Sequence, residues 1–554
     1  MKKTILIAIL ISFITTTAQS QEPQKPLTTN KFINENIFVH VNSNFLLTGE
    51  KLYYKIYCLT QEDKTFSTFS KIAYLELIDS NNKTVFKQKT SIKNGVGYGD
   101  VFINTDIETG TYKLISYTNW MKNTQNFYED NLYIVNPYSK NTEINKTKQS
   151  FSINNLEKDS LTLLNKEKTN TYGKREKITF DFSNLIKNNY NNFSVSVRKK
   201  TINSLPLKKN VTSLPKKSYN KKNSKYFYLP ELRGSLIKGQ VFTLDSLNSV
   251  SNIKLTLSVK NGNKVTKTAI TNKFGEFYFN IKNLNSTKII LQMLDHNINN
   301  YVVKINNNNL IEKKYKNFPK IKFDNNIIET IKQRSLFTQI ENAYYNVKRD
   351  SIIKIQKKDS LFKNLKTVYN LDDYKRFKTV KETFTEITKD LWVTSDNKIR
   401  VRTRNYLSNK NYLSSLLIVD NHIIPNHNYF IEYDTYNIKT VSVITEDYFY
   451  GNQLYQGVVT IDTFNGDYTP QSKNIKEFDI LPVQNKKKYF FQQHNRTNNK
   501  RIPDFRTQLY WNPILKSNKV VFYSSDVTGE FVIEIEGFSQ KGKPISLRKT
   551  FFVH

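Results

Sequence analysis

The chain has 554 residues, a formal net charge of +36 and a single cysteine, Cys58. One cysteine excludes an internal disulfide, so burial must stabilise the fold, and 36 Phe with 34 Tyr supply apolar area for it. Lysine is spread along the whole chain, whereas a nucleic-acid surface needs clustered basic residues, so we expect no nucleic-acid partner. The length is enough for several domains of ordinary size.

The first twenty residues predict export. Lys2 and Lys3 precede an apolar run over residues 5–14, which is too short to span a bilayer as a helix. Ala18-Gln19-Ser20 then places small residues where a signal peptidase cleaves. We therefore expect residues 1–20 to be a signal peptide. The mature protein is expected in the periplasm or at the outer membrane, with the cell surface as an alternative.

Residues 36–137 are predicted to form a β-sandwich, because short β-branched and aromatic runs alternate with turns. The order of Leu47–Leu52, Tyr74–Asp79, Gly110–Tyr112 and Tyr117–Met121 resembles the macroglobulin-like β-sandwich of exported Bacteroidota proteins. Protease traps of that class carry a reactive Cys–Gln thioester, and Cys58 has neither the neighbours nor the position for one. Cys58 lies in an apolar run and is predicted to be a buried side chain.

Residues 146–200 look like part of a second macroglobulin-like sandwich. Thr171–Ile178 repeats the turn-then-strand entry of the first one, and Phe193–Arg198 alternates as a half-buried strand does. Residues 201–228 follow as a basic linker with repeated Lys pairs. This linker is either solvated or a surface for an acidic partner, such as lipid headgroups or an anionic polysaccharide.

Residues 229–310 are predicted to form a third β-sandwich. Ile253–Val259 alternates as a strand, and Asn261-Gly262 is a strong hairpin signal. The turn and aromatic strand of Thr271–Phe279 resemble the carboxypeptidase regulatory-like β-sandwich. That resemblance implies a structural or interaction domain without an active site.

Residues 325–365 are predicted to be a helical segment, with a second short helix over 379–388. Both are expected to bury one apolar face in the core. In the first helix that face comprises Ile327, Ile328, Ile331, Ile340, Ala343, Tyr344 and Val347; in the second it comprises Val380, Phe384 and Ile387.

Residues 366–470 are predicted to form a small α/β domain. Leu416–Ile424, Ile438–Val443 and Gly457–Thr463 resemble the plug domain of TonB-dependent outer-membrane receptors, with Asn421 in place of the usual Gly. Asn tolerates positive φ, so this departure is mild. A receptor barrel needs about twenty strands. The residues after this domain are too few for one, so we expect the chain not to be the transporter itself.

Residues 500–554 are predicted to be a further β segment, with a sorting signal for type IX secretion as the alternative. The expected fold class is therefore mainly β and multidomain, with tandem Ig-like or macroglobulin-like sandwiches and a small α/β plug-like domain.

The sequence contains few candidates for chemistry. Asp420, His422 and His427 share a loop that is either a weak metal site or a polar loop. The acidic pairs 372–373 and 446–447 are typical of solvated turns. No nucleophile-elbow, zinc-protease or phosphate-loop motif is present. We expect no enzyme, no cofactor and no catalytic, cofactor-binding or metal residues.

Two functions remain open. The first is an accessory or gating partner of an outer-membrane transport or secretion channel, bound to an outer-membrane β-barrel protein. The alternative is a surface or periplasmic adhesion or scaffold protein built from β-sandwiches.

Overall fold

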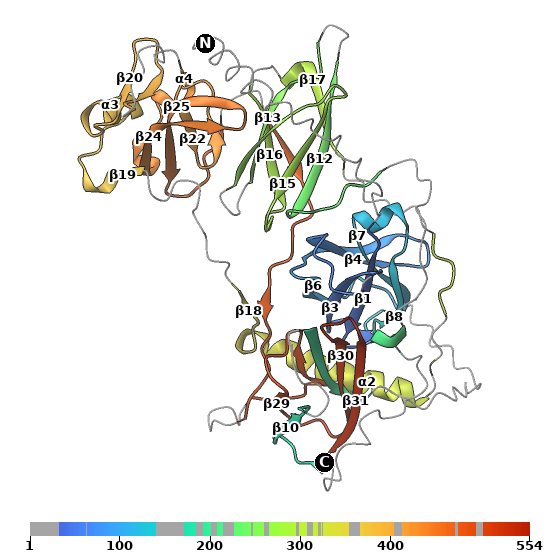
Figure 1. Ribbon diagram of the computed structural model, residues 1–554. Coiled ribbons are helices and arrows are strands. Elements are labelled where there is room, and N and C mark those ends of the chain that lie inside the picture. The colour runs from blue at the N-terminus through green and yellow to red at the C-terminus, as the bar shows by residue number, and fades with distance from the viewer. Residues whose placement is uncertain are drawn as a thin grey trace, which may run out of the picture. The chain divides into compact units, whose positions relative to one another are not determined.

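The computed structural model describes residues 33–62, 64–139, 171–183, 192–200, 208–213, 227–244, 248–259, 265–294, 298–306, 314–319, 323, 325–353, 366–403, 413–470, 475–494 and 502–554. The predicted signal peptide, residues 146–170, most of 201–228 and the turn at 261–262 lie outside these residues. The described residues are mainly β and form several separate sheets, which confirms the predicted fold class (Figure 1).

The first sandwich packs a three-stranded sheet against a five-stranded one. The first sheet has the order β1 (Glu35–Val41), β3 (Lys51–Thr60), β6 (Val96–Phe102). The second has the order β2 (Phe45–Leu47), β8 (Tyr128–Val135), β7 (Gly110–Thr118), β4 (Ile72–Ile78), β5 (Thr84–Ser91), with the short turn η1 (Trp120–Asn123) after β7. Aromatic and β-branched side chains fill the space between the sheets. Cys58 is fully buried in this core, as predicted.

The second sandwich is assembled from two distant parts of the chain. Its large sheet has the order β28 (Gln508–Asn512), β11 (Phe193–Lys199), β30 (Gly529–Phe538), β31 (Pro544–Val553), β9 (Thr171–Tyr172). A smaller sheet pairs β10 (Lys177–Asp181) with β29 (Lys519–Tyr523). Residues 146–200 and 500–554 were predicted to be separate segments, whereas Val195 pairs with Ile535 in one sheet. The separation failed because strand alternation does not reveal which strands pair.

The third sandwich also takes a strand from a distant segment. One sheet has the order β15 (Glu276–Ile281), β12 (Ser235–Thr243), β17 (Tyr301–Ile305), and η4 (Ile298–Asn300) precedes β17. The other has the order β14 (Thr266–Ile270), β13 (Lys254–Val259), β16 (Lys288–Met293), β26 (Ile475–Asp479). Gly239 lets the aromatic strand approach, because a Cβ there would lie 2.1 Å from the Phe277 ring.

The fourth unit is α/β, as predicted. Its mixed sheet has the order β19 (Lys366–Asn370), β24 (Ile438–Tyr450), β25 (Gln453–Thr463), β22 (Leu416–Val419), β23 (His422–Ile423). Around it lie α3 (Val380–Glu386), α4 (Asn428–Ile431), η6 (Leu371–Asp373), η7 (Thr435–Asn437) and the hairpin of β20 (Leu391–Val393) and β21 (Ile399–Val401). Helix α3 begins at a capping box between Thr379 and Glu382. Asn421, in the turn between β22 and β23, adopts a φ of +74°, a conformation that Asn tolerates.

Helix α2 (Asn325–Ala343) is shorter and more polar than predicted. Its buried side chains are Ile327, Ile331, Ser335 and Thr338. The prediction that 343, 344 and 347 continue the buried face is wrong, since these side chains are exposed. The helix ends at Ala343, and η5 (Tyr345–Val347) and the short strand β18 (Ser351–Ile352) follow, the latter paired with β27 (Lys487–Lys488). Ile327 and Ile331 pack against apolar side chains of the first sandwich, and the buried side chains after them, Ser335 and Thr338, are polar.

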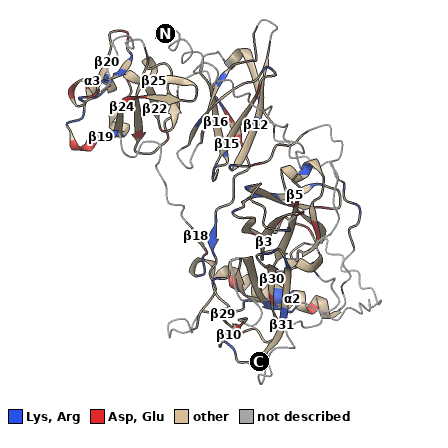
Figure 2. Ribbon diagram, in the orientation of Figure 1, with Lys and Arg blue, Asp and Glu red and all other residues tan. Residues whose placement is uncertain are grey.

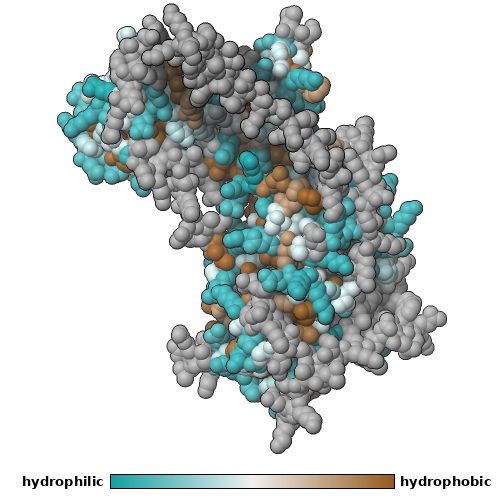
Figure 3. Space-filling view, viewed as in Figure 1, coloured by the Kyte–Doolittle hydropathy of each residue, from teal (hydrophilic) through white to brown (hydrophobic). Residues whose placement is uncertain are grey.

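Charged and apolar side chains are distributed rather than gathered. Basic residues occur in every unit of the ribbon (Figure 2). On the face shown in Figure 3, apolar side chains form small separate groups among polar ones. Among the helices described, none is long and apolar enough to cross a membrane.

Candidate functional site

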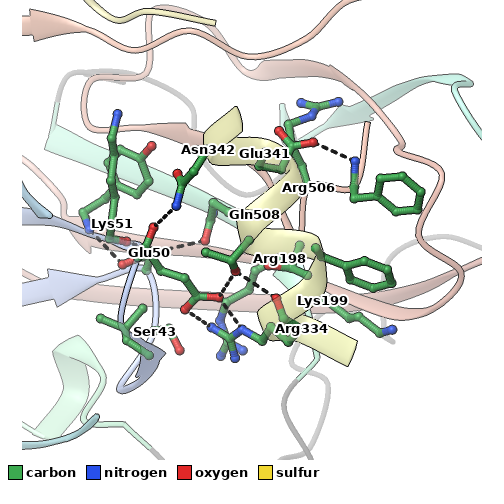
Figure 4. A pocket seen from close by; sticks show the side chains of 18 of the residues that line it. Ser43, Glu50, Lys51, Arg198, Lys199, Arg334, Glu341, Asn342, Arg506 and Gln508 are labelled. Carbon is green, nitrogen blue, oxygen red and sulfur yellow. Dashed lines mark hydrogen bonds and ion pairs between the residues drawn. The ribbon is translucent and has the colours of Figure 1, made fainter. Parts of the chain in front are cut away.

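A cavity of about 210 Å³ lies where α2 meets the first two sandwiches. Its wall comes from the loop before β3, from the end of β11, from α2 and from residues 490–491 and 505–508. Figure 4 shows Arg334 on α2 turned toward Glu50 in this wall, with Asn342 and Glu341 further along the helix. We call this region, comprising α2 and the residues that line the cavity, the joint.

An ion pair between Arg334 and Glu50 fixes the middle of α2. The Arg334 Nε and Nη2 atoms donate to the two Glu50 carboxylate oxygens at 2.6 and 2.7 Å. Nη2 also donates to the Phe45 carbonyl at 3.2 Å. The two side chains are 17% and 11% exposed, so the pair is largely shielded from water. A bidentate pair of this kind sets the rotation of the helix as well as its position.

A glycine permits the close approach of α2. Gly49 has a φ of +91°, and a Cβ there would lie 3.1 Å from the Thr338 side chain. The Asn342 amide donates to the Gly49 carbonyl at 2.9 Å. The turn at 48–50 therefore contacts the helix through its backbone, which explains why this turn carries a glycine.

The C-terminal end of α2 is bound to the second sandwich. Glu341 accepts from the Lys348 ammonium at 2.8 Å and from the Phe505 backbone N–H at 2.7 Å. The rings of Phe337 and Phe505 stack with centroids 5.1 Å apart. The helix thus contacts the first sandwich through its middle and the second through its end, and it holds the two together.

A second set of polar contacts joins the two sandwiches directly. The His40 Nδ1 atom lies 2.7 Å from the Ser194 hydroxyl, and the Tyr57 hydroxyl donates to the Glu536 carbonyl at 2.7 Å. The Lys55 ammonium donates to the Phe193 carbonyl at 3.1 Å. Burial lowers the pKa of both His40 and Lys55 well below their ordinary values. Burial also raises the pKa of the Glu536 carboxyl to about 7.

Part of the predicted basic linker is bound in this interface. The Lys208 ammonium donates to the Val41 carbonyl at 2.8 Å and to Glu534 at 2.6 Å. The turn η3 (Val211–Ser213) follows, and the Val211 N–H donates to the Glu536 carboxylate at 2.9 Å. Over residues 208–213 the chain is therefore attached to both sandwiches, so the expectation of a solvated linker is wrong for this part.

The structure separates the three residues of the candidate metal loop. Asp420 accepts from the Thr463 and Tyr468 backbone N–H groups at 2.9 and 3.0 Å. His422 Nδ1 lies 2.8 Å from the Ser258 hydroxyl, and His427 Nδ1 accepts from a backbone N–H in β21. Burial and the nearby Arg400 lower the pKa of His427 to about 4. Within the described ranges, no group of acidic, His and Cys side chains is placed to hold a metal ion.

The acidic pairs serve local structure. Asp372 and Asp373 are exposed in the turn η6, and Asp372 forms an ion pair with Arg376 at 2.5 Å. Glu446 is exposed in β24, where the register with β25 shifts.

The joint itself was missed from the sequence, because its groups are far apart in the chain. The one available signal was Arg334 and Glu341 within an otherwise regular helix.

Comparison with known proteins gives no close relative. No protein-family model matches the sequence, and no curated protein matches it. Among solved structures, Escherichia coli alpha-2-macroglobulin activated by porcine elastase is 8% identical, with a TM-score of 0.23 over 94% of this chain. Salmonella alpha-2-macroglobulin is 8% identical with a TM-score of 0.24, also over 94% of this chain. Dimeric latent PorU from Porphyromonas gingivalis is 9% identical with a TM-score of 0.16, again over 94% of this chain.

The chain spans only part of each of these structures: 44% of the E. coli protein, 40% of the Salmonella protein and 34% of PorU. TM-scores of this size do not establish a common fold over the whole chain. The sandwich assignments therefore rest on the strand pairing described above.

Proposed function

We propose that the chain is a non-enzymatic scaffold of the bacterial envelope. In this scaffold the second sandwich carries two inserted units, which are the third sandwich and the α/β unit. The observation that carries this proposal is the place where the insertion begins and ends. Residues 200–507 leave the second sandwich after β11 and return before β28, and these two strands are neighbours, with Val195 opposite Asn512. Both ends of the insertion are thus attached to adjacent strands, which suits a base that carries modules.

The chemistry of the joint supports a structural role. Each carboxylate that lines the cavity of the joint faces a cation: Glu50 faces Arg334, and Glu341 faces Lys348. Asp350 faces Lys51 at 2.6 Å. Neutralised pairs fix geometry, whereas catalytic acids and bases need a group left available for proton transfer.

Packing of the plug-like unit favours a fixed module over a free plug. One face of its sheet is covered by its own helices and hairpin. The other face carries Ile418, Ile444 and Val458 and packs against Leu294 of the third sandwich. The Tyr450 hydroxyl also donates to the Thr266 carbonyl of that sandwich at 2.9 Å. A receptor plug would have the wall of its barrel around it instead.

A second candidate function, gating of an outer-membrane channel, is favoured by one surface. Tyr429, Tyr436 and Phe464 are 56%, 60% and 50% exposed. Tyr436 precedes β24 and Phe464 follows β25, and the Phe464 N–H donates to the Asn437 carbonyl, so these two lie at one end of the sheet. An aromatic surface there would suit contact with an outer-membrane β-barrel partner.

One experiment separates the two functions. Residues 368–468 are replaced by a flexible linker in the producing bacterium, and envelope permeability, secretion and proteins captured from solubilised outer membranes are compared with the wild type. The scaffold function predicts unchanged permeability and secretion with intact sandwiches. The triple change Tyr429→Ser, Tyr436→Ser and Phe464→Ser should then also leave them unchanged. A permeability or secretion defect with both variants, and loss of a captured barrel protein, would overturn the scaffold function in favour of gating. Tyr138→Ser is the control, since Tyr138 is 48% exposed on the first sandwich.

A further inference from the structure

The cavity of the joint is large enough to hold one aromatic ring. Its volume is about 210 Å³, and an apolar protein cavity of about 150 Å³ is known to bind benzene. Tyr345 and Phe490 line the cavity and are 47% and 38% exposed, so it opens to solvent. A small molecule from solution can therefore enter it.

Aromatic rings form much of the wall of this cavity. The Phe337 and Phe505 rings stack with their centres 5.1 Å apart. The Tyr53 ring lies 6.4 Å from that of Phe491, and it also stacks on Trp511 at 6.0 Å, which holds it in place. Aromatic rings pair in stacked or edge-to-face contacts, and this adds to the gain from burial alone. The wall therefore favours an aromatic ring over a flexible alkyl chain.

All but one of the charged groups of the wall form ion pairs. The three carboxylates that line the cavity each face a cation of the same wall: Glu50 faces Arg334, Glu341 faces Lys348, and Asp350 faces Lys51. Three more lining cations face carboxylates that do not line it: Arg198 faces Glu534, Lys200 faces Glu530, and Arg506 faces Asp504. These pairs leave one cation of the wall.

Lys199, at the end of β11, is the remaining cation (Figure 4). Among the residues that the structure describes, its ammonium has neither an ion pair nor a hydrogen bond. Burial and the nearby Arg334 lower the pKa of Lys199 below its ordinary value. A half-buried cation without a counter-ion is costly, so a carboxylate placed beside it would be stabilised. A ligand can supply this negative charge.

We infer that the cavity of the joint binds a small carboxylic acid with one aromatic ring, its carboxylate beside Lys199 and its ring against Phe337. Such a ligand would contact α2 and the second sandwich together, so its binding should tighten the joint. This inference goes beyond the scaffold function and does not depend on it, because it concerns the cavity whether or not the inserted units are displayed.

The test is calorimetric titration of the full chain with 3-phenylpropionate, with 3-phenylpropan-1-ol and with hexanoate as separate ligands. The aromatic acid should bind about tenfold more tightly than the alcohol, which is the effect of one charge-assisted hydrogen bond. It should also bind several-fold more tightly than hexanoate, which carries the charge without the ring. Equal binding of the alcohol would overturn the role of the charge, and equal binding of hexanoate would overturn the ring. Absence of binding by 3-phenylpropionate would overturn the inference as a whole.

Amide hydrogen exchange places the ligand in the chain. At a ligand concentration of about 100 times Kd, opening that destroys the site should fall about a hundredfold. Peptides covering residues 325–343 should therefore exchange more slowly by about this factor, while the core of the third sandwich is unchanged. Unchanged exchange of α2 at saturation would overturn the assignment to the joint.

The variant Lys199→Met tests the charge. It removes the ammonium and keeps most of the side-chain volume, so 3-phenylpropionate should bind about tenfold more weakly and 3-phenylpropan-1-ol equally well. The matched control is Lys519→Met, since Lys519 lies on the second sandwich with its side chain 61% exposed, and binding of both ligands should stay unchanged. Unchanged binding of 3-phenylpropionate to folded Lys199→Met would overturn the role of Lys199.

The variant Thr330→Trp tests the place of the ring. Thr330 lies on α2 in the wall of the cavity, and a tryptophan there would occupy part of the space. Both aromatic ligands should bind about tenfold more weakly or not at all. If Lys199→Met fails to fold, this variant decides the outcome. Equally tight binding to folded Thr330→Trp would place the ring elsewhere and overturn the inference.

Discussion

Removing the Arg334 guanidinium should release α2 from the first sandwich. In Arg334→Met the Glu50 carboxylate would lose both charge-assisted bonds and remain 11% exposed. Breaking one partner of a buried ion pair costs about 3–5 kcal/mol. Glu50 would still accept from the Leu47 N–H at 2.9 Å, so the lower end of that range applies. We expect about 3 kcal/mol, which is roughly a hundredfold increase in local opening.

Amide hydrogen exchange measures this opening directly. Peptides covering residues 325–343 should exchange about a hundredfold faster in Arg334→Met, while the core of the third sandwich stays unchanged. The control is Lys332→Met on the same helix, whose ion pair with Glu329 spans 3.8 Å with side chains 70% and 76% exposed. An exposed pair contributes about 0.5 kcal/mol or less, so the control should change exchange little. Equal effects of the two variants would refute the idea that the buried pair holds the helix.

Three further predictions address the interior. Burial raises the pKa of Glu536 from 4.5 to about 7. Between these two pH values the folded protein keeps a proton that the unfolded chain releases. The free energy of unfolding should therefore fall as the pH rises from 4.5 to about 7. Glu536→Gln should therefore stabilise the protein by about 1–3 kcal/mol at pH 8 and hardly at all at pH 4, and equal urea midpoint shifts at both values would contradict this. Cys58→Ser should lower the free energy of unfolding in urea by about 1–2 kcal/mol. Burial raises the pKa of the Cys58 thiol, so a disulfide reagent should label the wild-type protein only after it unfolds. Rapid labelling of the native chain would disprove this. Phe337→Ala removes the stack on Phe505 and should cost about 2 kcal/mol, seen as faster exchange over 325–343, so unchanged exchange would count against the stack.

Local patterns predicted local structure well. Alternation at Phe193–Arg198 corresponds to β11, and the apolar run Leu416–Val419 is β22, which is buried on both faces. In α2 the helical period was right, because Ile327, Ile331, Ser335 and Thr338 follow one stripe. The apolar character of that stripe ends at Ile331. The buried residues after Ile331 are polar, so a prediction made from apolar residues alone was wrong for that part of the helix.

Long-range pairing could not be predicted in this way. Arg198 and Glu534 are 336 positions apart, yet they contact each other across one sheet. Arg334 and Glu50, the central pair of the joint, are 284 positions apart. Nothing in a single sequence distinguishes the actual partner strand or counter-ion from the many equivalent candidates. The individual strands were therefore predictable, whereas their assembly and the joint were not.

The divided second sandwich also constrains how the protein can fold after synthesis. Strand β11 has neighbours β28 and β30 on its two sides, and both follow it by more than three hundred positions. Until those residues emerge, β11 exposes two unpaired edges, which are prone to aggregation. Pairing at such separation is slow, since loop closure precedes any gain from contacts. We therefore expect the first sandwich and the inserted units to fold early, and a nascent chain to need a holding chaperone until its last β-hairpin arrives.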